Sequence, residues 1–202
     1  KNLKDEDFRN QVQYVFQDCE RAMAWETGSL KTAVLRAIGQ KASELEPQEH
    51  SQLNNILQTL GLEHLKDKEV LELSGGQLRR AYIARALFKL IFDQKTDHPI
   101  VLVLDEATVG LDLVAQYRLL SLLDSYCADA SRMLSLVVIS HDPVVVRYLS
   151  DQLVVMQKGD RERSGAGIVE TLFGEQITKG PYSHQHTRDL MNTQHLARQA
   201  LQ

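Results

Sequence analysis

Two adjacent carboxylates follow one of the longest apolar runs of this 202-residue chain. The run, Ile100–Leu104, predicts a strand of a parallel sheet that is covered on both faces, and Asp105 and Glu106 come directly after it. Ligands of open α/β sheets bind outside the carboxyl ends of such strands. Consecutive side chains point to opposite sides, so one acid can hold Mg²⁺ while the other polarises an attacking water. The alternative is that the pair only ends a strand and caps a helix.

A serine and two glycines open a helix predicted after Leu73. Ser74 supplies a hydroxyl, and Gly75 and Gly76 leave backbone N–H groups unhindered at the positive end of the helix, which suits a phosphate. An ordinary serine N-cap is the alternative. Two glycines in a first helical turn cost about 1 kcal/mol each relative to alanine, which favours the phosphate interpretation.

A histidine ends a second apolar segment, Leu134–Ser140, which also predicts a buried strand. His141 follows it, and Pro143 is well placed to start a helix. A lone histidine at a strand end is usually a satisfied polar residue. Beside a phosphate site, its imidazole can donate to a γ-phosphate oxygen.

Alternating strands and helices must position these residues, which predicts a layered α/β core. Alternation at Val12, Tyr14 and Phe16 predicts a strand, and period-3.6 patterns predict helices between Leu30 and Leu65, with an interruption at Pro47. A helical block from about 19 to 92 is inserted in the core. The other expected elements are helices at Leu111–Tyr126 and His186–Leu201 and short strands at Asp151–Gln157 and Ile168–Leu172.

Composition excludes several classes of protein. With 23 basic and 27 acidic side chains the net charge is −4, which gives no electrostatic case for nucleic-acid binding. The apolar runs are too short to cross a membrane, and the polar start shows no signal peptide. Cys19 and Cys127 have no metal or redox spacing, which suits a reducing compartment. We expect a soluble cytosolic protein that neither inserts into the membrane nor binds nucleic acid.

Taken together, these segments resemble the ABC ATPases. Their order and intervals are those of the family, in which they correspond to the Q-loop at Gln17, the signature motif at Leu73–Gln77, the Walker B strand ending at Asp105 and Glu106, the D-loop at Gly110–Asp112 and the switch His141. Two further segments, Val15–Asp18 and Ser183–Arg188, resemble the peptide/nickel importer branch. Ala107 replaces a common proline, and Thr108–Gly110 replaces the usual Ser-Ala, at backbone-tuning positions.

The resemblance implies a P-loop NTPase-like ABC ATPase core, here an incomplete and mostly parallel sheet with an inserted helical subdomain. Residues 1–18 would carry a strand and the Q-loop, 19–92 the helical subdomain with the signature motif, and 93–202 the remaining core. The cofactors would be ATP and Mg²⁺. The partners would be membrane-spanning permease subunits and a second ABC ATPase subunit, at the inner face of the cell membrane.

The resemblance also implies a role for each residue. Glu106 would be the general base, and His141 would steady the γ-phosphate. Asp105 would support Mg²⁺, and Gln17 would sense Mg²⁺ or water. Asp112 would communicate across the dimer. The residues that would contact nucleotide held by the partner subunit are Ser74, Gly75, Gly76 and Gln77.

One family motif is missing, because the chain contains no G-x-x-x-x-G-K-[ST]. The nearest imitation, Gly28–Thr32, lacks the glycine before its lysine, and we expect a helix start there with Ser29 or Thr27 as cap. A chain without this loop has nothing to cradle the β- and γ-phosphates. We expect the intact protein to supply the loop before Lys1, and the present chain alone to be inactive.

Three readings of function remain open at this stage. The first is an ATPase subunit of a peptide or nickel importer. The second is a non-transport ABC protein, such as an accessory subunit of a phosphonate-degrading complex, and the third is a nucleotide-binding module without hydrolysis. Nickel binding by His184, His186 and His195 is less favoured, since they fall on or beside a polar helix.

Overall fold

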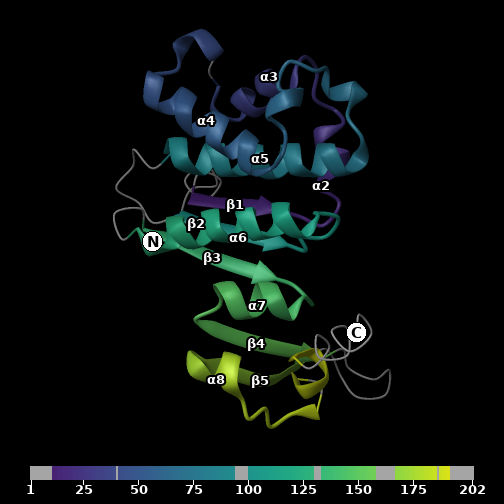
Figure 1. Cartoon of the computed structure of the whole chain (residues 1–202), viewed down its shortest axis with the longest axis vertical. Helices are drawn as coiled ribbons and strands as arrows, with labels where there is room; N and C mark the ends of the chain where they lie inside the picture. Colours follow the sequence, from purple (N-terminus) through teal and green to yellow (C-terminus); the bar gives the residue numbers. More distant parts are fainter. Residues whose placement is uncertain are drawn as a thin grey trace, which may run out of the picture. The chain divides into compact units, whose positions relative to one another are not determined.

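The chain divides into two compact units, Lys1–Ile139 and Ser140–Gln202, which are described separately (Figure 1). The computed structural model describes residues 11–39, 41–93, 100–129, 133–157, 167–185 and 187–191. The division of the sequence into residues 1–18, 19–92 and 93–202 stays a prediction.

A three-stranded parallel sheet forms the centre of the first unit. Its strands are β1 (Val12–Val15), β2 (Ile100–Asp105) and β3 (Leu134–Ile139), in the order β1-β2-β3. All three strands were predicted. The register places Val15 beside Leu104, and Asp105 beside Ile139. The carboxyl ends of the strands therefore meet at one edge of the sheet, where the predicted site residues follow.

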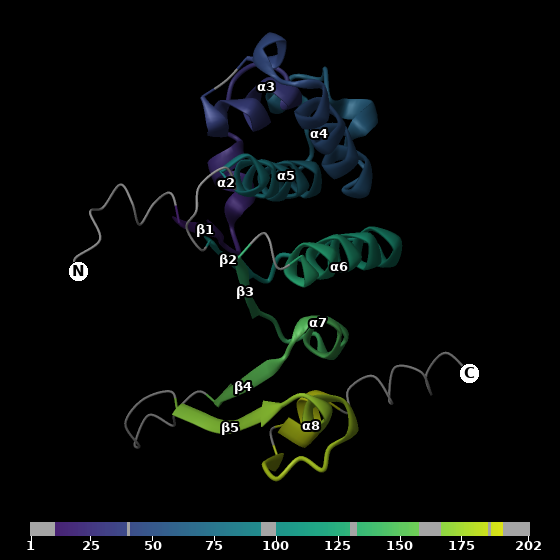
Figure 2. The same ribbon diagram turned by 90° about the vertical axis from the view of Figure 1, so that its left-hand side faces the viewer.

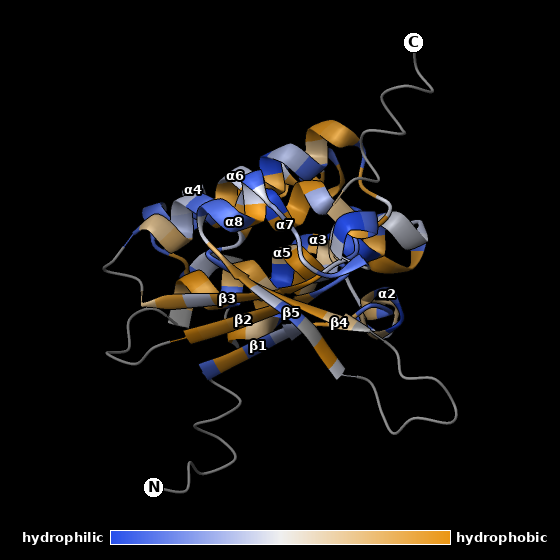
Figure 3. Ribbon diagram, turned by 90° about the horizontal axis from the view of Figure 1, so that it is seen from below, coloured by the Kyte–Doolittle hydropathy of each residue, from blue (hydrophilic) through white to orange (hydrophobic). Residues whose placement is uncertain are grey.

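One face of this sheet is less covered than the apolar segments predict. The buried residues of β2 alternate with half-buried ones, and β3 alternates between half-buried and exposed residues. Val137 and Ile139 are 46% and 48% exposed. The expectation that both strands are covered on both faces is wrong for the described residues, because α6 (Leu113–Ala128) lies on one side of the three strands (Figure 2). In Figure 3, β2 and β3 are nonetheless coloured mainly as hydrophobic.

Helices occupy most of the chain between β1 and β2, as the change of period predicted. Ser29 is the N-cap of α3 and its hydroxyl accepts from the backbone N–H of Thr32 at 3.3 Å, which confirms one of the two expected caps. Pro47 is the first residue of α4, where proline is favoured. The elements are α2 (Cys19–Met23), α3 (Leu30–Leu35), η1 (Arg36–Ile38), η2 (Ala42–Glu44), α4 (Pro47–Thr59), η3 (Glu63–Leu65), η4 (Val70–Glu72) and α5 (Gly75–Asp93).

The core of the first unit lies among these helices. The largest fully buried side chains all come from residues 23–90, and α5 contributes Ile83, Leu87, Phe88 and Leu90. The helix α5 contacts α2, α3, α4 and β1. It is therefore the element around which the helical block packs, and it also connects that block to the sheet.

The second unit is a small α/β unit with its own core. It contains α7 (Pro143–Leu149), the antiparallel pair β4 (Gln152–Gln157) and β5 (Gly167–Phe173), and α8 (Glu175–Lys179). Residues 187–191 are helical, and most of the predicted helix His186–Leu201 lies outside the described residues. The core residues are Val146, Leu153, Val155, Leu172, Ile177 and Met191, with Tyr182 packed against them.

Truncating a leucine of α5 tests where the core lies. We expect Leu90→Ala, at a position with no exposed surface, to lower the free energy of unfolding by about 2–5 kcal/mol, because it leaves a cavity in packed surroundings. The same change at Leu71, which is 77% exposed, should cost less than about 1 kcal/mol. Urea unfolding of both variants measures the difference, and equal losses would contradict this description of the core.

Candidate functional site

The last residue of β2 is held by a tyrosine from the neighbouring strand. The hydroxyl of Tyr14 on β1 donates to Oδ2 of Asp105 at 3.1 Å. This hydrogen bond, together with desolvation and the carboxylate charge, raises the pKa of Tyr14 above its ordinary value. Tyr14 therefore stays a donor at neutral pH and orients a carboxylate that the sequence predicted as a metal support.

Glu106 leaves the strand through an unusual backbone conformation. Its φ of 52° lies in the left-handed region, which a residue with a side chain adopts at a cost of about 1–3 kcal/mol. Its N–H donates to the carbonyl of Ile139 at 2.9 Å, and its own carbonyl accepts from the N–H of Val109 at 3.1 Å. The alternation of side chains along a strand therefore sets the direction of the Asp105 side chain alone. The side chain of Glu106 takes its direction from the turn that follows the strand.

The signature turn, Ser74–Gln77, forms a reciprocal cap. The backbone N–H of Ser74 donates to Oε1 of Gln77 at 2.9 Å, and the N–H of Gln77 donates to the Ser74 hydroxyl at 3.4 Å. This is the capping-box arrangement, with glutamine in the acceptor role that glutamate often has. The capping alternative for Ser74 is thus what the structure contains, and phosphate binding by the turn stays a prediction.

The two glycines of this turn face open space. A Cβ added at Gly75 or Gly76 would meet no other heavy atom within 4 Å among the described residues, and both residues are exposed. Neither glycine has a positive φ, so neither backbone conformation requires glycine. Packing within the chain therefore does not explain two residues that weaken a helix start, whereas close approach of an external ligand would.

Gln17 lies just beyond β1 and is tied to the signature helix. The Nη2 atom of Arg79, on α5, donates to the backbone carbonyl of Gln17 at 2.6 Å. One residue earlier, the ring of Phe16 lies 5.4 Å from that of Tyr82, also on α5. The predicted Q-loop and the predicted signature helix are therefore neighbours, although they are far apart in the sequence.

Asp112 is the N-cap of α6. Its Oδ1 accepts from the backbone N–H groups of Val114 and Ala115 at 3.0 and 2.9 Å. The hydrogen bond from Ala115 is the main cause that lowers the pKa of Asp112, and the positive charge of Arg80 on α5 contributes. The carboxylate thus has a structural role within the chain, and its role across a dimer stays a prediction.

His141 belongs to the second unit, where it is exposed just before α7. Pro143 is the first residue of α7, as predicted, and the N-cap Asp142 accepts from the N–H of Val144 at 2.8 Å. Action of His141 on a γ-phosphate stays a prediction.

The segment Ser183–Arg188 is organised around a carboxylate of β5. Glu170 accepts from the N–H and hydroxyl of Ser183 at 2.8 and 2.6 Å and from the N–H of His184 at 3.3 Å. These bonds and one from Thr187, with that of the Ser183 hydroxyl the largest influence, lower the pKa of Glu170 to about 2. Arg188 donates to the carbonyls of Tyr182 and Ser183. Polar contacts thus hold Ser183, His184 and Arg188 in place, whereas His186 and His195 lie outside the described residues.

Sequence reasoning missed Tyr14, Arg79 and Arg80. The sequence pattern predicted Tyr14 only as part of a strand and assigned no contact to either arginine. A usable signal was their place near the start of α5, one residue beyond the signature turn, because cations near a helix start oppose the helix dipole and need other partners.

Among the described residues, no group of three or more His, Cys, Asp or Glu side chains is arranged to hold a metal ion. Likewise, no helix among those residues is long and apolar enough to span a membrane.

Comparison with known proteins agrees with the motif order. A family described as ABC transporter matches residues 1–109, which is more than half of the chain. A methionine import ATP-binding protein of Acinetobacter baylyi is 31% identical over 160 residues, covering 78% of this chain and 40% of that protein. A nickel import ATP-binding protein of Rhodospirillum rubrum is 37% identical over 134 residues, covering 65% and 46%.

A dipeptide transport protein and a solved structure are also similar to this chain. A probable D,D-dipeptide transport ATP-binding protein of Escherichia coli is 37% identical over 120 residues, which cover 59% of this chain and 33% of that protein. The chain thus spans less than half of each of these relatives. The structure of cbiO1 from Clostridium perfringens, part of the ABC transporter complex cbiONQ, has a TM-score of 0.57 at 24% identity, over 97% of this chain and 68% of that one. This likeness confirms the predicted fold class.

The Glu170 turn should be sensitive to acid. Its folded pKa of about 2 lies below the ordinary 4.5, so its stabilisation is complete above about pH 4.5 and is lost as the pH falls towards 2. We expect Glu170→Gln to increase hydrogen exchange at the Ser183 and His184 amides at pH 6, and the difference from wild type to vanish near pH 2. Glu175→Gln, at an exposed ion pair with Lys179, is the matched control. A difference that persists unchanged to pH 2 would contradict this account.

Proposed function

Because this chain belongs to the ABC transporter family, we propose that the protein containing it binds and hydrolyses ATP to energise an importer. One observation carries the proposal: the carboxyl ends of the neighbouring parallel strands β1 and β2 present Gln17, Asp105 and Glu106 at the sheet edge where α/β proteins bind ligands. The hydrogen bond from Tyr14 to Asp105 spans these two strands. The motif order of the family supports the same function.

The donor set near Asp105 fits Mg²⁺. Carboxylate and amide oxygens are the ligands this ion prefers, so Asp105 would hold it, through water, and Gln17 would add its amide oxygen. The Tyr14 hydroxyl uses one side of Oδ2 and leaves the other carboxylate oxygen for the ion. When bound, Mg²⁺ would neutralise charge on the β- and γ-phosphates.

Glu106 is the group proposed to act on water. Its carboxylate would orient the attacking water and accept its proton during in-line attack on the γ-phosphate. The left-handed backbone at Glu106 is a strained conformation of the kind that clusters at active sites. His141 would donate to a γ-phosphate oxygen and steady the developing charge.

The signature turn is proposed to serve a second subunit. In a head-to-tail pair of ABC subunits, the open space above Gly75 and Gly76 would receive the phosphates of nucleotide held by the partner. Asp112, which ends the loop after Glu106, would lie at the same contact and report on its state. Whether the pair consists of two copies or of two homologues is decided by native mass spectrometry of the purified protein.

Membrane-spanning permease subunits are the other proposed partners. The helical block from about 19 to 92 would receive a cytoplasmic segment of the permease, and the protein would sit on the inner face of the cell membrane without inserting into it. Relatives named for methionine import and nickel import support an importer, and another is named for D,D-dipeptide transport, so we propose a peptide or nickel cargo. Co-purification with two membrane subunits would separate this function from a non-transport ABC protein.

Replacing the base tests the assignment of Glu106. We expect Glu106→Gln in the full-length protein to reduce ATP turnover by about 10²–10⁴-fold, because the amide keeps the shape of the side chain but cannot accept a proton. Nucleotide binding should survive, so Mg·ATP should trap dimers that size-exclusion chromatography resolves.

The matched control is Glu63→Gln, an exposed glutamate at the start of η3, which should leave turnover unchanged. Wild-type turnover in Glu106→Gln would show that another group is the base. Binding of Mg·ATP by the wild-type protein without any turnover would favour a nucleotide-binding module without hydrolysis.

A further inference from the structure

Side chains of α5 contact the segment that follows β1, residues 16–27, at two places. At the first, Arg79 donates to the Gln17 carbonyl at 2.6 Å, and Tyr82 packs its ring on Phe16 at 5.4 Å between centroids. Residues three apart are neighbours on a helix surface, so Arg79 and Tyr82 act on adjacent residues of one short turn.

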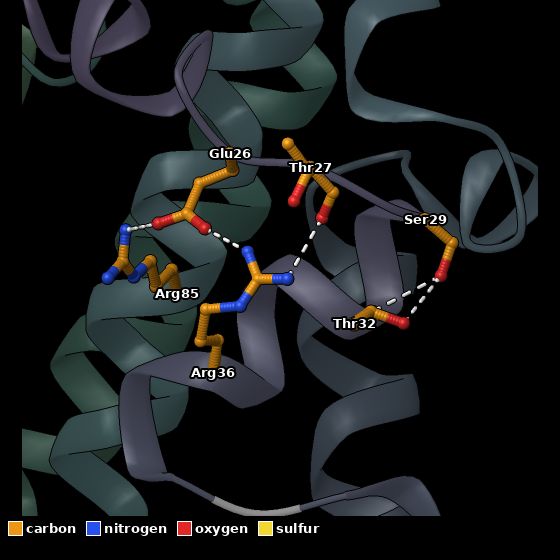
Figure 4. A network of polar contacts seen from close by, with 6 residues as sticks. All are labelled: Glu26, Thr27, Ser29, Thr32, Arg36 and Arg85. Atoms are coloured by element: carbon orange, nitrogen blue, oxygen red, sulfur yellow. Dashed lines mark hydrogen bonds and ion pairs between the residues drawn. The ribbon is translucent and has the colours of Figure 1, made fainter.

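The second place is an ion-pair network at the end of the same segment (Figure 4). Glu26 lies between two guanidinium groups: Arg85 of α5 contacts its Oε1 at 2.7 Å, and Arg36 of η1 contacts its Oε2. Arg36 also donates to the carbonyl of Thr27 at 3.1 Å. This network anchors the segment without touching Gln17, so it provides a comparison for Arg79.

The contact made by Arg79 is strong for its kind. A charged donor makes a stronger hydrogen bond than the usual neutral pair. The guanidinium also lies close to Cys19: burial raises the pKa of this thiol to about 11, and the charge of Arg79 opposes that rise. The Arg79 Nε atom is buried and has no hydrogen-bond partner among the described residues. The guanidinium therefore lies beside Gln17 and Cys19, with its Nε shielded from solvent.

The other end of this connection is the signature turn. Ser74 and Gln77 are linked by the capping box, and the Leu78 N–H donates to the Ser74 carbonyl at 2.8 Å. The turn is thus continuous with the hydrogen-bonded helix that carries Arg79. A displacement of the Gln17 backbone would therefore be transmitted to α5, and the reverse also holds.

We propose that Arg79 is a positioning residue that couples Gln17 to the signature turn, so that the two nucleotide-facing elements of the first unit move together. This inference rests on the proposed function for what it regulates. Arg79 touches no reacting atom in the proposed hydrolysis of ATP. It fixes the peptide that carries the Gln17 side chain, and it joins sensing of the metal or water to the surface presented to the partner subunit.

Hydrogen exchange without nucleotide tests the connection itself. In the full-length protein, Arg79→Met should increase exchange at the Cys19 and Arg21 amides about tenfold, the effect of losing a charged hydrogen bond. Arg85→Met, which removes the tie to Glu26 on the same helix, should change those amides less than about twofold. Arg79→Lys, which keeps a positively charged donor, should restore part of the protection. Equal exchange in the two methionine variants would overturn the proposal.

Addition of Mg·ATP tests the coupling. In wild type and in Arg85→Met, we expect nucleotide to change exchange at both Cys19 and Leu78, whereas in Arg79→Met it should change only one of the two. A merely structural role of Arg79 would leave both responses in place, which would overturn the coupling. If the wild-type protein shows no response to Mg·ATP at any amide, the proposed function fails, while the nucleotide-free experiment still decides whether Arg79 holds Gln17.

Discussion

Parallel pairing of β1, β2 and β3 is the constraint on which the site depends. Parallel strands run in the same direction, so whatever follows their carboxyl ends is collected at one edge of the sheet. Pairing of Val15 with Leu104 and of Asp105 with Ile139 therefore sets the distance between residues that lie far apart in the chain. A slip of one residue would turn Asp105 to the helix-covered face and remove its contact with Tyr14.

The helix α5 connects the sheet to the helical block. It is the element that packs against α2, α3, α4 and β1, and its buried leucines form much of the core. Its first turns hold the polar contacts, with Arg79 on the Gln17 carbonyl and Arg80 near Asp112. One helix therefore supplies both the stability of the first unit and the connection between three of its loops.

Local features of this fold could be predicted from sequence, because local chemistry determines them. The Ser29 cap, the proline start at Pro143 and the apolar runs of β2 and β3 depend on residues close together in the chain. The Arg79–Gln17 contact could not, since it joins residues 62 positions apart and one partner is a backbone carbonyl that any residue type offers. Exposure of Val137 was also hidden, because an apolar strand does not reveal what covers its second face.

The left-handed backbone at Glu106 brings the stability of the chain into conflict with its proposed activity. Glycine would adopt a φ of 52° without steric cost, so Glu106→Gly would relax the turn while removing the acid. Under the role proposed for Glu106, the change that relaxes this turn would also remove the base, so thermostability and catalysis would be traded against each other at one position. Engineering for heat resistance in this protein should leave the position untouched, whatever a stability screen favours there.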